Sequence, residues 1–298
     1  MADSIRIKLD TSKYAVPTQD DILAAKRFVL RREEYARLLQ SRIDEILSEA
    51  AEKVVKICYR YDIDPKNIYF SSAFNEKMMD EISDVMNEAD DEIIDLIFEY
   101  STRVTNDKDR ISALLLWMAT LGRGNRNLQD TLDGYLYKTM KDWESAIAAL
   151  RFANVSLADA VTKIKTHLHT IYTMPEVLAA FRKSSEFTAT YIRNKGVQQG
   201  GVGLSNNGST NVTNMARITL QMVWMRSQAM DYKEQGAIGL YVLRGSSYPC
   251  ALCDDNCGFH QIEESYGVLP VHPSCCCYAI PIFSKDFGNL SHEITDYQ

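Results

Sequence analysis

The sequence contains no uninterrupted apolar run that approaches the ~20 residues needed to span a membrane. Its first residues also lack the basic and then apolar order of a secretory signal, so we expect a protein made and kept in a reducing cytoplasm. Basic residues are outnumbered, since 33 Lys and Arg stand against 40 Asp and Glu. Sequence-independent binding of nucleic acid requires a surplus of Lys and Arg, and the net charge of −7 argues against this class of function.

Catalytic motifs are missing as well. The sequence has no G-x-x-x-x-G-K-[ST] phosphate loop, no H-E-x-x-H motif, and no serine, histidine and aspartate constellation with motif support. One acidic cluster could bind divalent cations, but we expect it on an exposed helix face, where a solvated role is favoured. Its members are Asp80, Glu81, Asp84, Glu88, Asp90, Asp91, Glu92 and Asp95. We therefore expect no enzyme and no small-molecule substrate.

Cysteine is nearly absent from most of the chain, where Cys58 stands alone in a predicted helix. The other six cysteines lie in one short stretch that also contains His260 and His272. They are Cys250, Cys253, Cys257, Cys275, Cys276 and Cys277. A reducing environment disfavours disulfides, so this concentration of thiols and imidazoles predicts a small, core-poor module held together by a metal ion.

Two half-sites supply the expected metal ligands. Cys250 and Cys253 form a C-x-x-C turn, and His272 begins a second pattern that continues with Cys275 and Cys277. Zinc suits thiolate and imidazole ligands, and four of them close a structural site with no place for a reactive water. The first choice of ligands is Cys250, Cys253, His272 and either Cys275 or Cys277. Disulfide or redox use, and inert free thiols, remain the alternatives.

Neighbouring cysteines point to different sides of an extended chain. Cys276 is therefore not expected to bind the same ion as both Cys275 and Cys277. A site with four ligands cannot use all six cysteines, so the remaining thiols would not bind the ion.

The first two thirds of the chain carry the three- and four-residue apolar spacing of amphipathic helices. Helix starts are expected at Thr18 or Asp20, at Asn106 or Asp107, and at Ser156. Gly122 and Gly124 can end a helix. The predicted helices cover about residues 20–61, 74–100, 107–118, 128–150, 156–171, 174–192 and 213–235.

Composition divides the chain into three parts. Residues 1–195 are expected to form a large helical domain, and residues 196–212 a glycine-rich flexible loop with too little apolar area to order itself. Residues 213–298 are expected to form a small α+β module that contains one more helix, a short strand at 238–243 and the Cys/His cluster. The predicted fold class is mainly α, with a zinc-knuckle-like C-terminal module.

The segment 216–281 resembles the C-terminal part of the Mu F-like phage head morphogenesis proteins. In that family a helix with an Ala-Arg motif leads into a strand, a C-x-x-C turn, a glycine and a Pro-x-His-Pro-x-Cys-x-Cys stretch. The matching residues here are Ala216, Arg217, Leu240 to Leu243, Cys250, Cys253, Gly258, Pro270, Val271, His272, Pro273, Ser274, Cys275, Cys277 and Pro281. Their shared order and spacing are more specific than any single motif.

The chain departs from the family pattern at two places. The family usually has a glutamate shortly after the motif arginine, where this chain has Ile218 and Thr219. It usually has an arginine between the last two motif cysteines, where this chain has Cys276.

The resemblance implies a structural minor capsid protein of a tailed phage, present in few copies and made in the host cytoplasm. Such a protein assembles the procapsid near the portal, so its expected partners are portal and capsid proteins, and its expected location is the capsid interior or portal vertex. Contact with packaged DNA would be indirect, and no membrane is expected as a partner.

Two alternatives stay open beside this function. Modules resembling this one also occur joined to toxin or transferase domains, so the helical part could belong to a phage-encoded or toxin-like enzyme. The cysteine-rich part could instead be a zinc-dependent interaction module. Binding of nucleic acid by that module is disfavoured, because residues 248–282 contain no Lys or Arg.

Overall fold

The computed structural model describes residue 10 and residues 12–63, 72–121, 126–170, 207–247, 250–263 and 268–285. These residues belong to two compact units. Unit 1 combines Met1–Leu38, Glu99–Met118 and Arg217–Gln298, and unit 2 combines Leu39–Phe98 and Ala119–Ala216. The predicted division at the glycine-rich loop stays a prediction, and residues 196–206 of that loop and the predicted helix 174–192 lie outside the described residues.

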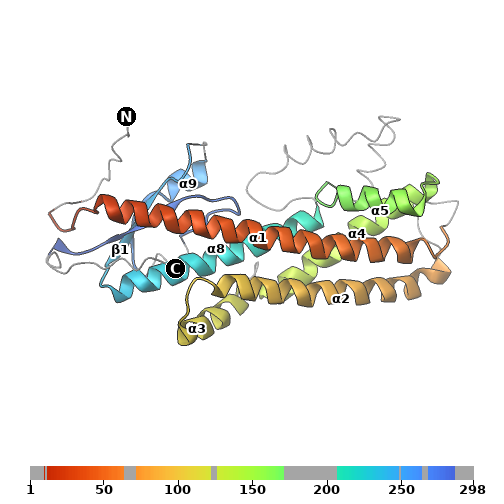
Figure 1. Ribbon diagram of the computed structural model, residues 1–298, viewed down its shortest axis with the longest axis horizontal. Coiled ribbons are helices and arrows are strands. Elements are labelled where there is room, and N and C mark those ends of the chain that lie inside the picture. Colours follow the sequence, from red (N-terminus) through yellow and green to blue (C-terminus); the bar gives the residue numbers. More distant parts are fainter. Residues whose placement is uncertain are drawn as a thin grey trace. The chain divides into compact units, whose positions relative to one another are not determined.

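Helices dominate both units, as the apolar spacing predicts. They are α1 (Gln19–Cys58), α2 (Ser72–Thr102), α3 (Lys108–Ala119), α4 (Leu128–Phe152), α5 (Leu157–Thr166), α8 (Gly208–Glu234) and the short α9 (Ala251–Asp255) (Figure 1). Three predicted starts are confirmed by side chains that accept hydrogen bonds from backbone amides of the first turn: Thr18, Asp107 and Ser156. Helix α5 ends at Thr166, five residues before the predicted end.

Unit 2 is a bundle of helices held by an apolar interior and by polar contacts between helices. Its part of α1 buries Leu39, Ile43 and Leu47 completely, in the predicted stripe. Ion pairs join Lys53 of α1 to Glu88 of α2, and Lys165 of α5 to Glu52 of α1, each at 2.8 Å.

Helix α8 begins at Gly208, five residues earlier than predicted, so the proposed loop does not extend to residue 212. The Asn207 side chain accepts a hydrogen bond from the Thr210 amide at 2.8 Å, and the buried carboxylate of Asp142 accepts one from the Gly208 amide at 2.9 Å. A carboxylate at a helix N-terminus also interacts favourably with the helix dipole. Close packing requires a glycine, because a Cβ at position 208 would lie 2.4 Å from the backbone nitrogen of Thr139. The Asn-Gly-Ser-Thr sequence is therefore a helix start and not a linker.

Unit 1 contains an antiparallel sheet of three strands in the order β2-β1-β3: β1 (Gly239–Leu243), β2 (Gly258–Gln261) and β3 (Tyr278–Ile282). The prediction of a strand at 238–243 is confirmed. The strands β2 and β3 were not predicted, because each is short and lies next to cysteines and turn residues. Together with α9 they give the predicted small α+β part, so the fold class of a mainly helical protein is confirmed.

Aromatic side chains form the centre of the helical part of unit 1. Trp224 of α8 is buried against Phe28 and Tyr35 of α1, with ring centroids 5.8 and 5.0 Å away. Its indole nitrogen donates a hydrogen bond to the Tyr100 carbonyl at 3.2 Å. These contacts fix the N-terminal part of α1 against α8, and thereby place Arg32 inside the unit.

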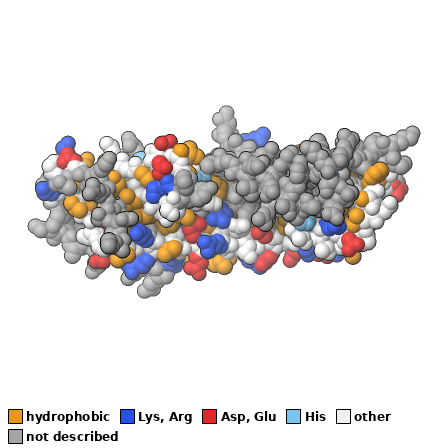
Figure 2. All heavy atoms as spheres, turned by 90° about the horizontal axis from the view of Figure 1, so that it is seen from above, with side chains coloured by type: hydrophobic (Ala, Val, Ile, Leu, Met, Phe, Trp, Pro, Cys, Tyr) orange, Lys and Arg blue, Asp and Glu red, His pale blue; other side chains and the backbone are white. Residues whose placement is uncertain are grey.

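The described surface is mixed in charge. On the face drawn in Figure 2, acidic, basic and hydrophobic side chains are interspersed over the described residues. Each helix in the described part of the chain is too short or too polar to cross a lipid bilayer.

The acidic cluster of α2 is largely exposed, as predicted for a solvated face. Asp90 differs, because it is partly buried and lies near Asp133 of α4. Burial raises the pKa of Asp90 to about 6, and the Asp133 carboxylate adds to the shift. Gln129 donates a hydrogen bond to each of the two carboxylates.

We expect Asp90→Asn to stabilise the protein at pH 7.5 by about 1 to 2 kcal/mol, after allowance for partial exposure. The folded-state pKa of Asp90 lies above the ordinary value of 3.8, so stability falls as the pH rises from 3.8 and the full cost of the charge is present above about pH 6. Below about pH 3 the carboxyl is protonated in both the folded and the unfolded state, and the advantage of the variant should vanish. Urea denaturation at about pH 7.5 and about pH 3 measures this, with exposed Asp84→Asn as the control. A variant that is no more stable at pH 7.5 would contradict the expectation.

Candidate metal centre

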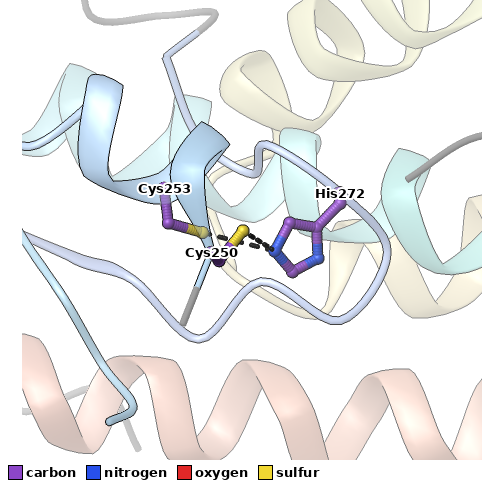
Figure 3. Close-up of side chains that lie close together, drawn as sticks. All are labelled: Cys250, Cys253 and His272. Carbon is purple, nitrogen blue, oxygen red and sulfur yellow. Dashed lines mark hydrogen bonds between the residues drawn. The ribbon is translucent and has the colours of Figure 1, made fainter. Parts of the chain in front are cut away.

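Cys250, Cys253 and His272 lie together at one end of the cysteine-rich part of unit 1 (Figure 3). Cys250 immediately precedes α9, Cys253 lies in its first turn, and His272 comes from the segment before β3. The His272 Nε2 atom is 3.6 Å from Cys250 Sγ and 3.3 Å from Cys253 Sγ. In Figure 3 both sulfur atoms face the same edge of the imidazole ring.

These separations suit a common ion. In a tetrahedral site with metal–sulfur and metal–nitrogen distances of about 2.3 and 2.0 Å, a sulfur and a nitrogen ligand lie about 3.5 Å apart. The two observed sulfur–nitrogen distances bracket this value. The C-x-x-C turn and the histidine can therefore hold a metal ion without rearrangement.

A second group of donors shares Cys253 with the first. The sulfur atoms of Cys253, Cys275 and Cys277 lie within 4.8 Å of one another, and all three residues are buried. All five residues predicted as ligands are thus gathered around Cys253, although they come from segments about 20 residues apart. Among the described residues, no four of these donors all lie within 4.8 Å of one another, so the structure shows two overlapping groups of three, and the predicted four-ligand set stays a prediction.

The remaining cysteines of the cluster stand outside both groups. Cys276 is directed to the Ser274 carbonyl at 3.7 Å, which agrees with the expected alternation of neighbouring cysteines. Cys257 is exposed, and its thiol donates to the Cys253 carbonyl at 3.1 Å. All seven cysteines lie in described residues and are free thiols, so no disulfide joins them.

The sheet brings the two half-sites together. Strands β1 and β3 are antiparallel, and Leu243 at the end of β1 is paired with Tyr278 at the start of β3. The chain that leaves β1 toward Cys250 therefore starts beside the segment of Cys275 to Cys277. Gly245 is at the closest point, since a Cβ there would lie 1.6 Å from the Cys276 carbonyl oxygen.

The thiols differ strongly in acidity. The pKa of Cys275 is lowered to about 5 by a hydrogen bond from the Cys277 thiol, by backbone hydrogen bonds and by the Arg32 charge, which together outweigh the effect of burial. Burial raises the pKa of Cys253 to about 12. The pKa of Cys277 is raised by its hydrogen bond to Cys275 and by burial. Since metals bind thiolates, loading this centre releases protons and weakens as the pH falls.

A buried polar network lies behind the Cys275 segment. Arg32 of α1 is fully buried and donates a hydrogen bond to the Cys275 carbonyl at 2.5 Å. Glu33 lies 3.3 Å from Arg32, and it also accepts from Arg217 at 3.2 Å and from Gln221 at 2.5 Å. Glu33 of α1 thus pairs with Arg217, the arginine of the Ala-Arg motif in α8. The residues that directly follow Arg217 in the sequence include no glutamate that could do so.

Arg32 and Glu33 were not predicted as site residues from the sequence. A signal for Arg32 exists, because it occupies a place in the apolar stripe of α1 between Val29 and Ala36, which are buried. A charged residue in such a stripe needs a polar partner in the interior. The partner of Arg32 is the backbone carbonyl of Cys275, 243 residues away in the sequence, and no local pattern in α1 predicts it.

Two histidines of unit 2, His167 and His169, follow the end of α5. His169 is only partly exposed and is bonded on both ring nitrogens. Its Nε2 lies 2.9 Å from Asp44 and its Nδ1 lies 3.3 Å from Thr210. It therefore clamps the end of α5 to α1 and α8. Burial lowers the pKa of His167.

Comparison of the chain with protein-family models, with curated proteins and with solved structures finds no match in any of the three.

We expect Gly245→Ala to open the cluster, because its methyl group would overlap the Cys276 backbone. In the unaltered protein, reaction with an aromatic disulfide reagent should label exposed Cys257 quickly and buried Cys275 and Cys277 slowly. The variant should show additional fast thiols.

The matched control is Gly134→Ala within α4, where a Cβ meets only the flexible end of Arg126 at 3.3 Å. It should leave the thiols unchanged and stabilise α4 by about 0.5 to 1 kcal/mol. An unchanged number of fast thiols in Gly245→Ala would show that the close approach is not needed.

Proposed function

We propose that this chain is a structural minor capsid protein of a tailed phage, which acts near the portal during procapsid assembly and is packaged inside the head. The observation that carries the proposal is the convergence of the residues on which the resemblance to Mu F-like proteins rests. Cys250, Cys253, His272, Cys275 and Cys277 belong to one pattern in the sequence and to one cluster of donors in space. The strand β1, which the resemblance expects before the C-x-x-C turn, supports the same assignment.

The ion proposed for this centre is zinc. Thiolates and imidazole are the ligands that zinc prefers, and a reducing cytoplasm keeps the thiols available. The ligands are Cys250, Cys253, His272 and one of Cys275 and Cys277. With four protein ligands the ion has no open position for water, so its role is to stabilise the fold. This supports a structural protein and not an enzyme.

The size of the sheet explains why such an ion is useful. The strands β1, β2 and β3 have five, four and five residues, and β2 has no fully buried residue. Strand β2 and the turn of Cys250 and Cys253 bury little apolar surface, and a bound metal would add free energy that packing does not supply there.

The proposed partners are portal and capsid proteins. Helix α1 carries the exposed apolar residues Leu23, Leu30 and Leu38 on the surface of unit 1, and Leu30 is 71% exposed. Exposed leucines on a rigid helix are suited to protein contacts. The cysteine-rich segment has no Lys or Arg between residues 248 and 282, so contact with DNA would be indirect.

We expect about one zinc per chain in the purified full-length protein, measured by elemental analysis. Cys250→Ser and His272→Ala should each lose the ion, because they remove a ligand. Cys257→Ser is the matched control and should keep it, since Cys257 lies outside both donor groups. A full-length protein without metal, or equal zinc content in all three variants, would refute the centre.

Purified phage particles should contain the protein in few copies, measurable by mass spectrometry. Phage carrying Cys250→Ser should yield fewer complete heads, while Cys257→Ser should assemble normally. Purified virions and procapsids that both lack the protein would refute the assembly role, whatever the metal content.

A further inference from the structure

The part of α1 that belongs to unit 1 carries a row of exposed leucines. Leu23, Leu30 and Leu38 are 45%, 71% and 47% exposed. They are seven and eight residues apart, which is about two helical turns in each case, so they lie on the same side of the helix. No other helix in the described part of the chain has three exposed large hydrophobic residues. Single exposed leucines are ordinary, but a row of them on one helix face is typical of a docking surface.

This leucine stripe is set among charges that are mostly positive. Between its first and last leucine, the exposed charged residues are three basic and one acidic: Lys26, Arg27, Arg37 and Glu34. An occupant with acidic residues beside an apolar face would complement this surface. A second copy of the same stripe would instead bring like charges together, which disfavours pairing of two chains through it.

Residues 286–298 have the complementary composition. Three acidic residues, Asp286, Glu293 and Asp296, stand there without any Lys or Arg. The apolar residues recur at three- and four-residue steps, namely Phe287, Leu290, Ile294 and Tyr297. This spacing predicts an amphipathic helix with one apolar face. The segment lies outside the described residues, and the described chain leads directly into it at Lys285.

Strand β3 brings this segment to the beginning of α1. The Lys26 ammonium of the stripe lies 5.6 Å from the centre of the Tyr278 ring at the start of β3. Beyond the end of β3, the Lys285 amide donates a hydrogen bond to the Lys13 carbonyl at 3.1 Å. Residue 286 therefore follows directly from a point that is bonded to the chain just before α1. As a helix, residues 286–298 would measure about 20 Å, which is close to the length of about 22 Å that the stripe covers.

We propose that residues 286–298 dock on the leucine stripe of α1 in the same chain, with their apolar residues against Leu23, Leu30 and Leu38. Their carboxylates then lie among the basic residues of the stripe. The inference goes beyond the proposed function and depends neither on the metal centre nor on capsid assembly. It adds one consequence for assembly, since a partner protein that binds this stripe would compete with the segment.

The first test places a photoreactive benzoylphenylalanine at position 30 of the full-length protein and identifies the cross-linked peptides by mass spectrometry. Because this residue is apolar like Leu30, docking should persist, and the cross-links should lie within residues 286–298. The matched control carries the same group at position 116 of α3. Leu116 is 75% exposed in unit 1 but does not belong to the stripe, so no cross-link to 286–298 is expected there.

Mixing chains with light and heavy isotopes separates cross-links within one chain from those between two chains. The proposal requires cross-links within one chain. It would be overturned by cross-links to a second copy, either to its α1 or to its residues 286–298. It would also be overturned if position 30 gave no cross-link to the segment, or if position 116 gave the same ones.

The second test measures how fast chymotrypsin cleaves after Phe287 in the full-length protein. Leu30→Ser should speed this cleavage about 10-fold, because the docked segment loses an apolar contact and opens more often. The fold should persist, since Leu30 is mostly exposed. Leu116→Ser is the control and should leave the rate unchanged. Equal rates in Leu30→Ser and the unaltered protein would contradict docking on the stripe.

The charge of the stripe is tested by the same cleavage. Arg37→Glu should speed it about threefold, because an attractive surface charge becomes a repulsive one. Arg37→Lys keeps the positive charge and should match the unaltered protein. If both variants were cleaved at the same rate, charge complementarity would not hold the segment, and the choice of residues 286–298 as the occupant would be wrong.

Discussion

The pairing of β1 with β3 is the constraint on which the cysteine-rich part depends. Leu243 and Tyr278 are paired at the edge from which the chain leaves toward Cys250 and at which it arrives from Cys277. Without this register the two half-sites would be separate turns. With it, four other donor residues lie around Cys253, and the backbone of Gly245 lies against Cys276. Strand pairing and donor geometry therefore support each other.

Much of the helical fold could be predicted from local patterns. The stripe that includes Leu39, Ile43 and Leu47 lies inside because residues three and four apart share a helix face. Thr18 and Ser156 mark helix starts through hydrogen bonds to amides within three residues. Such features depend on neighbours in the chain, and this is why a single sequence reveals them.

The early start of α8 was missed for the opposite reason. Asn207 and Gly208 have the composition of a loop, and the carboxylate that receives the Gly208 amide comes from Asp142, 66 residues away. Arg32 is a similar case, since its partner is the carbonyl of Cys275. The closeness of the candidate donor residues could be predicted because their spacing repeats a chemical pattern, but the charges that surround them come from other elements.

The separation of the two half-sites also bears on the unfolded chain. Cys250 and His272 are 22 residues apart, and an ion held by both closes the intervening loop. A cross-link over a loop of this size removes chain entropy worth about 3 kcal/mol from the unfolded state. Unlike a disulfide, this closure is reversed by chelation at constant redox potential. If the proposed ion is bound, supply of metal and not of oxidant would decide when the segment becomes rigid.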